Sequence, residues 1–218
     1  MGCGKSTATR SFGELLAATG TPVAAFTEAA HPHPVRASDD LSDFFQPWAE
    51  IGADLLASRV REKWARYVQQ RLNDDVFTIM DGQLFHGDLT NLFMMETAPS
   101  DLSEHMGALM QVLAPLRPVV IYFRPTDLPE AIRRVFEARG SKWETYQLGW
   151  KLSSPYAAHR QLTGLQGLTA MYADYRSLTD ALFVALDCPK LAIDTSRGEW
   201  PQYYEQIREV LEKLHVRV

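Results

Sequence analysis

The sequence predicts an α/β protein with three layers, α/β/α, in which helices cover both faces of a parallel sheet. Helical periodicity alternates along the chain with short apolar runs that are rich in β-formers. No internal repeat and no low-complexity linker interrupts this alternation. Such alternation is typical of parallel strands, because each connection between them crosses a face of the sheet.

The composition is that of one ordinary globular domain. The 218 residues are 46% hydrophobic and 22% charged, which excludes the collagenous, disordered and coiled-coil classes. The net charge of −5 gives no general reason to bind nucleic acid or an anionic membrane. The chain has two cysteines, no apolar run of membrane-spanning length and no signal-peptide pattern. These features predict a soluble, cytoplasmic protein.

The first half of the chain begins with a helix. Apolar residues at helical spacing predict that it starts almost at residue 5 and stops at Gly20. Residues 22–27 predict the first strand, and the loop that follows contains prolines that prevent regular structure. Residues 41–72 predict a long helix with a break near residues 46–47 or at Gly52.

The second half continues the alternation. Strands are predicted over residues 75–80, 118–123 and 190–194. Helices are predicted over residues 84–95, 102–116, 128–138, 169–186 and 200–214. Residues 142–167 show no clear pattern and are expected to form a mobile cover. The aromatic residues of this cover, expected to pack in the core or the cover or to line an acceptor pocket, are Trp143, Tyr146, Trp150 and Tyr156.

Charged residues follow three of the predicted strands. Glu28 and Asp81 come after the first two strands, and Arg124 follows the third. Ligands of parallel sheets bind at the carboxyl ends of the strands, near the point where strand order reverses. We therefore expect the functional site at this edge.

The segment GCGKST at residues 2–7 matches the second half of the phosphate-binding (Walker A) loop, G-x-x-x-x-G-K-[ST]. In such a loop the backbone N–H groups face the phosphates, Lys5 reaches the β and γ phosphates, and Ser6 holds Mg²⁺. The alternative is a chance tetrapeptide at a helix start. The residues expected to bind the nucleotide are Gly2, Cys3, Gly4, Lys5, Ser6 and Thr7.

The first half of this motif is missing from the sequence. Its first glycine would lie two positions before Met1, and the strand of about 5–6 residues that feeds the loop is absent as well. One interpretation is that the native chain begins about ten residues earlier, because a sheet without this strand would leave ladder groups unpaired. The other is a shortened chain with a compromised site.

These motifs resemble the P-loop kinase family, in the nucleoside and nucleotide kinase branch that includes thymidylate kinase. The resemblance covers most of the chain and rests on GCGKST, the strand ends at residues 27–28 and 80–81, the helix IRRVFEARG and the strand LAIDTS. It implies a single domain, residues 1–218, with a five-stranded parallel sheet around the phosphate-binding strand. It also implies ATP with Mg²⁺ as phosphoryl donor and an arginine-bearing lid at about residues 125–167.

The resemblance also implies roles for single residues. Asp81 resembles the carboxylate near the metal, so that Ser6 and Asp81 are the implied metal ligands. Glu28 resembles the acidic residue that faces the acceptor, and it is the first candidate for a general base. The implied lid arginines and adenine loop are Arg133, Arg134, Arg139, Asp194, Thr195 and Ser196. The plainer alternatives are a solvated Glu28, an Asp81 that caps a helix, and a solvated basic face on the arginine helix.

The chain departs from thymidylate kinase after both carboxylates. It reads AAHPHP after Glu28, where that enzyme has Pro-Gly-Gly, and it lacks the expected arginine pattern after Asp81. No nucleotide acceptor is therefore carried over. The predicted function is an ATP-dependent phosphotransferase that acts on a hydroxyl or phosphate of a small molecule. The alternatives are an ATP-binding or hydrolysing P-loop module without kinase activity, and a truncated relative that binds no nucleotide. The acceptor and a homodimeric state are left open.

Overall fold

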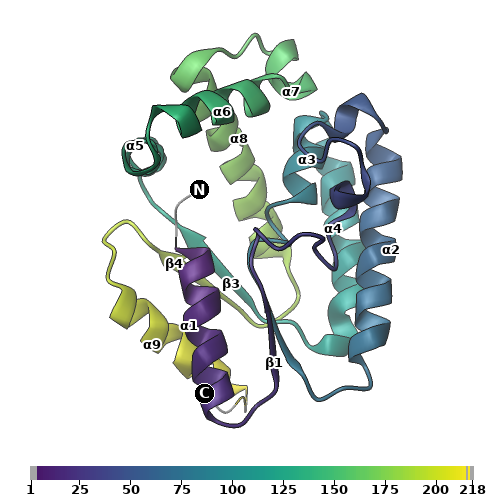
Figure 1. The fold of residues 1–218 in the computed structure, drawn as a ribbon, viewed down its shortest axis with the longest axis vertical. Helices are drawn as coiled ribbons and strands as arrows, with labels where there is room; N and C mark the ends of the chain where they lie inside the picture. The colour runs from purple at the N-terminus through teal and green to yellow at the C-terminus, as the bar shows by residue number, and fades with distance from the viewer. Residues whose placement is uncertain (1–3, 215, 217–218) are drawn as a thin grey trace.

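The computed structural model describes residues 4–214 and 216, and it shows an α/β chain (Figure 1). Gly2 and Cys3 of the predicted phosphate loop lie outside the described residues. The strands form two parallel pairs. β1 (Val23–Phe26) pairs with β2 (Phe77–Met80), and β3 (Val120–Arg124) pairs with β4 (Lys190–Asp194).

The five-stranded parallel sheet that the resemblance implies is not formed by the described residues, and its phosphate-binding strand is absent from the sequence. In the part of the chain that the structure describes, the strands make two separate two-stranded sheets, and no strand joins one pair to the other. A parallel ladder needs neighbouring strands about 4.8 Å apart. Here side chains, not a ladder, connect the two pairs. The α/β class and the parallel direction of both pairs are as predicted.

One face of the strands is covered by α1 (Lys5–Ala18) and α9 (Trp200–Lys213), which Figure 1 shows beside each other. Phe12 of α1 belongs to a cluster that also contains Ile79 of β2 and Ile121 of β3. This cluster is therefore what holds the two strand pairs together on that face, by burial of apolar area.

The other face is covered by the larger core. Leu56, Leu92, Leu102 and Leu168 are fully buried there. The helices that supply these residues are α2 (Ala53–Arg71), α3 (Asp88–Met94), α4 (Pro99–Leu113) and α8 (Gly164–Ala185). Helices thus cover both faces of the strands, as the alternation predicts. No helix among residues 4–214 has the length and apolar character needed to cross a bilayer.

The long helix predicted over residues 41–72 is shorter than expected. It begins only at Ala53, and a single 3-10 turn, Pro47–Ala49, stands in the segment before it. Pro47 lacks the N–H that a helix interior needs. The carboxylate of Glu50 accepts hydrogen bonds from the backbone N–H groups of Ser42 and Asp43, so this segment folds back on itself. Gly52, one of the two predicted break points, is the residue directly before α2, and residues 41–52 contain no α-helix.

The predicted lid, residues 125–167, is helical. It consists of α5 (Leu128–Arg139), α6 (Ser141–Leu152) and α7 (Pro155–His159). Gly140 separates α5 from α6 with a φ of 80°, a conformation that favours glycine. The pattern of α6 is hard to find in the sequence because the residues it buries, Gln147 and Lys151, are polar.

Candidate active site

The amino end of α1 presents the predicted phosphate-binding residues. Gly4 turns the chain into the helix with a φ of 78°. A Cβ at this position would lie 2.0 Å from the ring of Trp200, so only glycine fits. Lys5 and Ser6 follow in the first turn, where free backbone N–H groups favour anions. Thr7 is exposed.

Ser6 connects this first turn to the end of β2. Its hydroxyl donates a hydrogen bond to Oδ2 of Asp81, a carboxylate that is buried. Oδ1 of Asp81 is buried as well and accepts no hydrogen bond from any described residue. Asp81 caps no helix, because the cap position of α3 is Gly87. The helix-cap alternative for Asp81 is therefore wrong.

The pair Ser6 and Asp81 fits a Mg²⁺ ion. The amino group of Lys5 is 4.0 Å from Oδ1 of Asp81, too far for a hydrogen bond, so a closer cation would lower the cost of burying this oxygen. Mg²⁺ prefers oxygen ligands, and it is often held by one or two carboxylates together with substrate phosphates and water. No group of three or more His, Cys, Asp and Glu in the described part of the chain could hold a metal by itself. Phosphate oxygens would have to complete the shell.

Lys5 lies between the two carboxylates that follow β1 and β2. Its Nζ is 3.7 Å from Oε2 of Glu28 and 4.0 Å from Oδ1 of Asp81. Gly82 has a φ of 76°, and a Cβ there would come within 3.2 Å of Cε of Lys5. The glycine after Asp81 therefore leaves room for the lysine side chain. Glu28 and Asp81 are 53 residues apart in sequence, yet both carboxylates lie near the amino group of Lys5.

Glu28 is the centre of a second group, which we call the Glu28 cluster: Glu28, His86, Lys151 and Tyr172. His86 Nε2 lies 3.5 Å from Oε2 of Glu28. The charge of Glu28 interacts with the amino group of Lys151 and with the phenol of Tyr172. The cluster therefore brings together the loop after β1, the segment before α3, and helices α6 and α8.

The proton of His86 can be placed on Nδ1. Tyr175 donates its hydroxyl hydrogen to the carbonyl of Phe85, and Thr90 donates its own to Tyr175. Thr90 can then only accept, so the 3.3 Å contact between its Oγ1 and His86 Nδ1 makes Nδ1 the donor. Burial, and next the charges of Lys5 and Lys151, hold the pKa of His86 well below its usual value. The ring is thus neutral, and its bare Nε2 faces Glu28.

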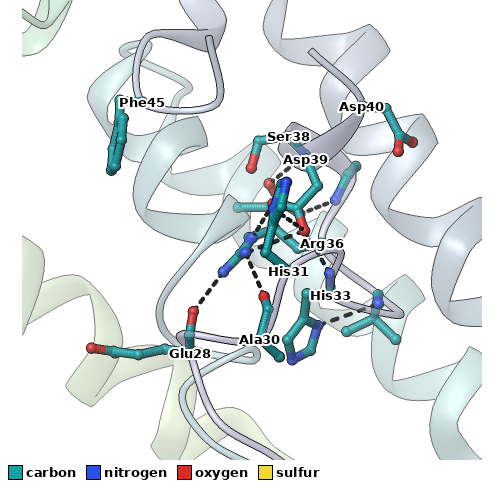
Figure 2. Close-up of polar contacts among 12 residues, drawn as sticks. Glu28, Ala30, His31, His33, Arg36, Ser38, Asp39, Asp40 and Phe45 are labelled. Atoms are coloured by element: carbon teal, nitrogen blue, oxygen red, sulfur yellow. Dashed lines mark hydrogen bonds and ion pairs between the residues drawn. The ribbon is translucent and has the colours of Figure 1, made fainter. Parts of the chain in front are cut away.

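A buried ion pair organises the loop that carries Glu28 (Figure 2). Arg36 donates hydrogen bonds to the carbonyls of Glu28 and Ala30, at 2.8 and 2.9 Å, and to the carboxylate of Asp39. Asp39 also accepts the N–H of His33 at 2.6 Å. Burial raises the pKa of Asp39, but the hydrogen bonds from Arg36 and His33 outweigh it, so the net pKa is lowered. The loop that the sequence predicts to be irregular is therefore held in place by the buried Arg36 and Asp39 side chains.

Aromatic side chains connect the segment around Phe45 to α6. The rings of Phe45 and Trp150 are 4.8 Å apart between centroids, and Trp150 donates its indole N–H to the carbonyl of Phe45. Tyr146 packs against both rings. Lys151 Nζ lies 3.5 Å from the centroid of the Trp150 ring. Phe45 thus contacts the ring against which the Lys151 amino group packs.

The lid arginines divide into two groups. Arg134 and Arg139 line a pocket of about 270 Å³ between α5 and the segment after β4, which we call the Trp200 pocket because Trp200 forms part of its wall. Arg134 donates to the carbonyl of Ser196 at 3.2 Å. Arg133 is paired with Glu130 and Glu137 on the exposed side of α5 and does not line the pocket.

The predicted adenine loop lies at the same pocket. Thr195 and Ser196 line it, whereas Asp194 does not. The Asp194 carboxylate accepts hydrogen bonds from Ser196 and Thr126, which hold its pKa well below the usual range. Asp194 therefore fixes the loop, and the two residues after it face the pocket. Trp200 touches this pocket and Gly4 alike, so the pocket adjoins the amino end of α1.

The structure brings Lys5, Ser6, Glu28 and Asp81 together, and it places Arg134, Arg139, Thr195 and Ser196 around the neighbouring pocket. Sequence reasoning missed Arg36, His86, Lys151 and Tyr172 as site residues. Lys151 and Tyr172 lie on helices far along the chain, where a single polar residue carries no pattern. The proline-bounded loop of Arg36 and its three-residue spacing to Asp39 were the only available signal.

Comparison with protein-family models, with curated proteins and with solved structures gives no significant match to this chain.

Proposed function

We propose that the protein is an ATP-dependent phosphotransferase with a P-loop kinase type of site. The observation that carries the proposal is the position of Lys5, within 4.0 Å of the carboxylates that end two parallel strands and next to the contact between Ser6 and Asp81. Phosphoryl transfer depends on positioned positive charge and on a metal-binding carboxylate around the transferred group. The positive charge of Lys5 and the carboxylate of Asp81 lie together at this position.

The amino end of α1 would bind the triphosphate. Its free N–H groups and Lys5 supply positive charge to the β and γ phosphates. Ser6 and Asp81 would hold Mg²⁺, which neutralises charge that develops on the phosphate oxygens. The adjoining Trp200 pocket offers an aromatic ring and two arginines to the remainder of the nucleotide.

Glu28 would accept the proton of the phosphoryl acceptor. The hydroxyl proton passes to the Glu28 carboxylate, the hydroxyl oxygen forms a bond to the γ phosphorus, and the bond from phosphorus to the bridging β–γ oxygen breaks. The products are the phosphorylated acceptor and ADP. Because Nε2 of His86 carries no proton, it can accept a hydrogen bond from the same hydroxyl and orient it toward Glu28.

The arrangement of strands supports a P-loop kinase type of fold as part of the proposal. The ends of β1 and β2 lie beside Lys5, and the segment after β4 lies beside Gly4 through Trp200. The amino end of α1 therefore stands between two parallel strand pairs, at the edge where ligands of such sheets bind.

The proposal is tested by ADP release. Purified protein is incubated with Mg·ATP and a panel of small alcohols, nucleosides and phosphate esters, and ADP is measured with and without each acceptor. We expect at least one acceptor to raise ADP release, and Lys5→Ala to abolish the increase. Lys213→Ala, an exposed lysine of α9, is the matched control. If ADP is released but no acceptor raises the rate, the protein is an ATP-hydrolysing module and not a transferase. If Lys5→Ala releases ADP as fast as the unchanged protein, Lys5 is not part of the active site and the proposal is wrong.

A further inference from the structure

Two buried donor groups in the Glu28 cluster have no acceptor. Lys151 is 1% exposed and Tyr172 is 8% exposed. No described residue accepts a hydrogen bond from Nζ of Lys151, and the hydroxyl of Tyr172 has no hydrogen-bond partner among the described residues either. Buried polar groups almost always have a hydrogen-bond partner. The lack of a partner for both of these donors therefore needs an explanation.

The two donors belong to helices that pack against each other, Lys151 to α6 and Tyr172 to α8. The charge of Glu28 acts on Lys151 and Tyr172, and the charge of Lys151 acts on His86. Lys151 is nevertheless outside ion-pair distance of Glu28, whose Oε2 is within 4.0 Å of Lys5 and His86 instead. The Lys151 amino group therefore makes no ion pair with Glu28.

A packing role does not explain a lysine at this position. An apolar residue of similar length would fill the same volume without the cost of burying an ammonium group. The face of the Trp150 ring, 3.5 Å from Nζ, favours the positively charged form of the lysine. The aromatic contacts of Trp150 with Phe45 hold this ring in place. The Trp150 ring thus holds the buried amino group of Lys151 in place.

We propose that Lys151 and Tyr172 form an anion subsite within the acceptor pocket, so that the acceptor carries a phosphate or carboxylate group beside the hydroxyl that faces Glu28. An ammonium group and a phenolic hydroxyl that both donate are suited to an anionic oxygen. The assignment of the hydroxyl rests on the proposed function, whereas the anion subsite itself requires no ATP.

The test is direct binding of small probes by titration calorimetry at about pH 6, where Lys151, with a pKa lowered by burial to about 7, is charged. The probes are glycerol 3-phosphate, D-glycerate and neutral glycerol, so that a phosphate and a carboxylate are compared on the same alcohol. We expect one anion to bind at least about tenfold more tightly than glycerol, and Lys151→Met to remove that advantage. Tyr172→Phe is expected to weaken the same anion severalfold.

Two variants serve as controls. Lys142→Met changes an exposed lysine of the same helix and is expected to bind as the unchanged protein does. The melting temperature of Lys151→Met must equal or exceed that of the unchanged protein, because the substitution removes a buried charge; loss of binding then cannot be attributed to unfolding.

The inference is overturned if the unchanged protein binds neither anion more tightly than glycerol, or if Lys151→Met binds the anion equally well. If Lys5→Ala abolishes anion binding and Lys151→Met does not, the anion binds at the phosphate loop. That result would refute the subsite without contradicting the proposed phosphotransferase function. Conversely, Lys151-dependent anion binding in a protein that shows no response to Mg·ATP would support the subsite and refute the proposed function.

Discussion

The hydroxyl of Ser6 donates a hydrogen bond to the buried carboxylate of Asp81, which joins the first turn of α1 to the end of β2. If this pair holds Mg²⁺, Asp81→Asn should remove the dependence of ATP binding on Mg²⁺, because an amide is a poor substitute for a charged oxygen ligand. Calorimetric titration of ATP with Mg²⁺ and with EDTA measures the effect. Asp187→Asn, an exposed position, is the control. A variant at Asp81 that retained the full Mg²⁺ effect would place the metal elsewhere.

The two arginines Arg133 and Arg134 are neighbours in sequence but differ in their surroundings. Arg134 lines the Trp200 pocket and Arg133 does not. We expect Arg134→Ala to weaken ATP binding by at least about tenfold, the loss of one charge-assisted hydrogen bond. Arg133→Ala should change it by less than about twofold, since exposed ion pairs contribute little. Equal effects of the two substitutions would show that the pocket does not hold the nucleotide.

The buried pair of Arg36 and Asp39 is expected to matter for stability. Arg36→Met leaves Asp39 buried and uncompensated, and we expect a loss of about 3–5 kcal/mol in the free energy of unfolding, measured by denaturant titration. Arg71→Met, which breaks a pair closer to the surface, with Asp74, should cost less than about 1 kcal/mol. The double variant Arg36→Met/Asp39→Asn should lose less than the sum of the single losses. Additive losses would mean that the two side chains are not coupled.

The burial of Lys151 predicts a pH-dependent stability. Burial lowers its pKa from 10.5 to about 7, against the opposing charge of Glu28. Between these values the unfolded chain binds more protons than the folded one, so stability rises with pH, by up to about 1.4 kcal/mol for each pH unit. Lys151→Met should therefore be more stable than the unchanged protein at pH values below about 7.

The same difference should shrink as the pH rises toward 10.5, the ordinary value for lysine. The neighbours do not titrate in this window. His86 has a pKa well below 6.5, and burial raises the pKa of Tyr172 well above 10.0. The measurement is denaturant unfolding of both proteins across the window. A stability difference that stays constant with pH would show that Lys151 keeps an ordinary pKa in the folded protein.

The sequence predicted those parts of the fold in which apolar spacing coincides with burial. The strand at residues 190–194 was predicted with the bounds that β4 has, and the helix before Gly20 corresponds to α1. The prediction failed for α6, whose buried residues are the polar Gln147 and Lys151. The five-stranded sheet that the resemblance implies is present among the described residues only as two separate parallel pairs, and the strand that would feed the phosphate loop is the one absent from the sequence.

For the site, the useful rule was that polar residues at the carboxyl ends of parallel strands meet. It predicted that Glu28, Asp81 and Arg124 lie at one edge. The structure brings Glu28 and Asp81 to Lys5, whereas Arg124 pairs with Asp180. The rule applies to strand ends and says nothing about polar residues on helices. Lys151 and Tyr172 lie on helices and could not be found in this way. Their identification required the burial of their donor groups and the absence of an acceptor among the described residues.

The central claim is that the amino end of α1 binds the phosphates of ATP through Lys5. Thermal unfolding with and without Mg·ATP, on the unchanged protein and on Lys5→Ala, tests it most directly. At about 100 times the Kd, ATP should add about 2.7 kcal/mol of stability, which corresponds to a rise of about 5 °C or more in Tm for a chain of this size. The account predicts this rise in the unchanged protein and its loss in Lys5→Ala. An unchanged Tm in both proteins, or an equal rise in both, would contradict it.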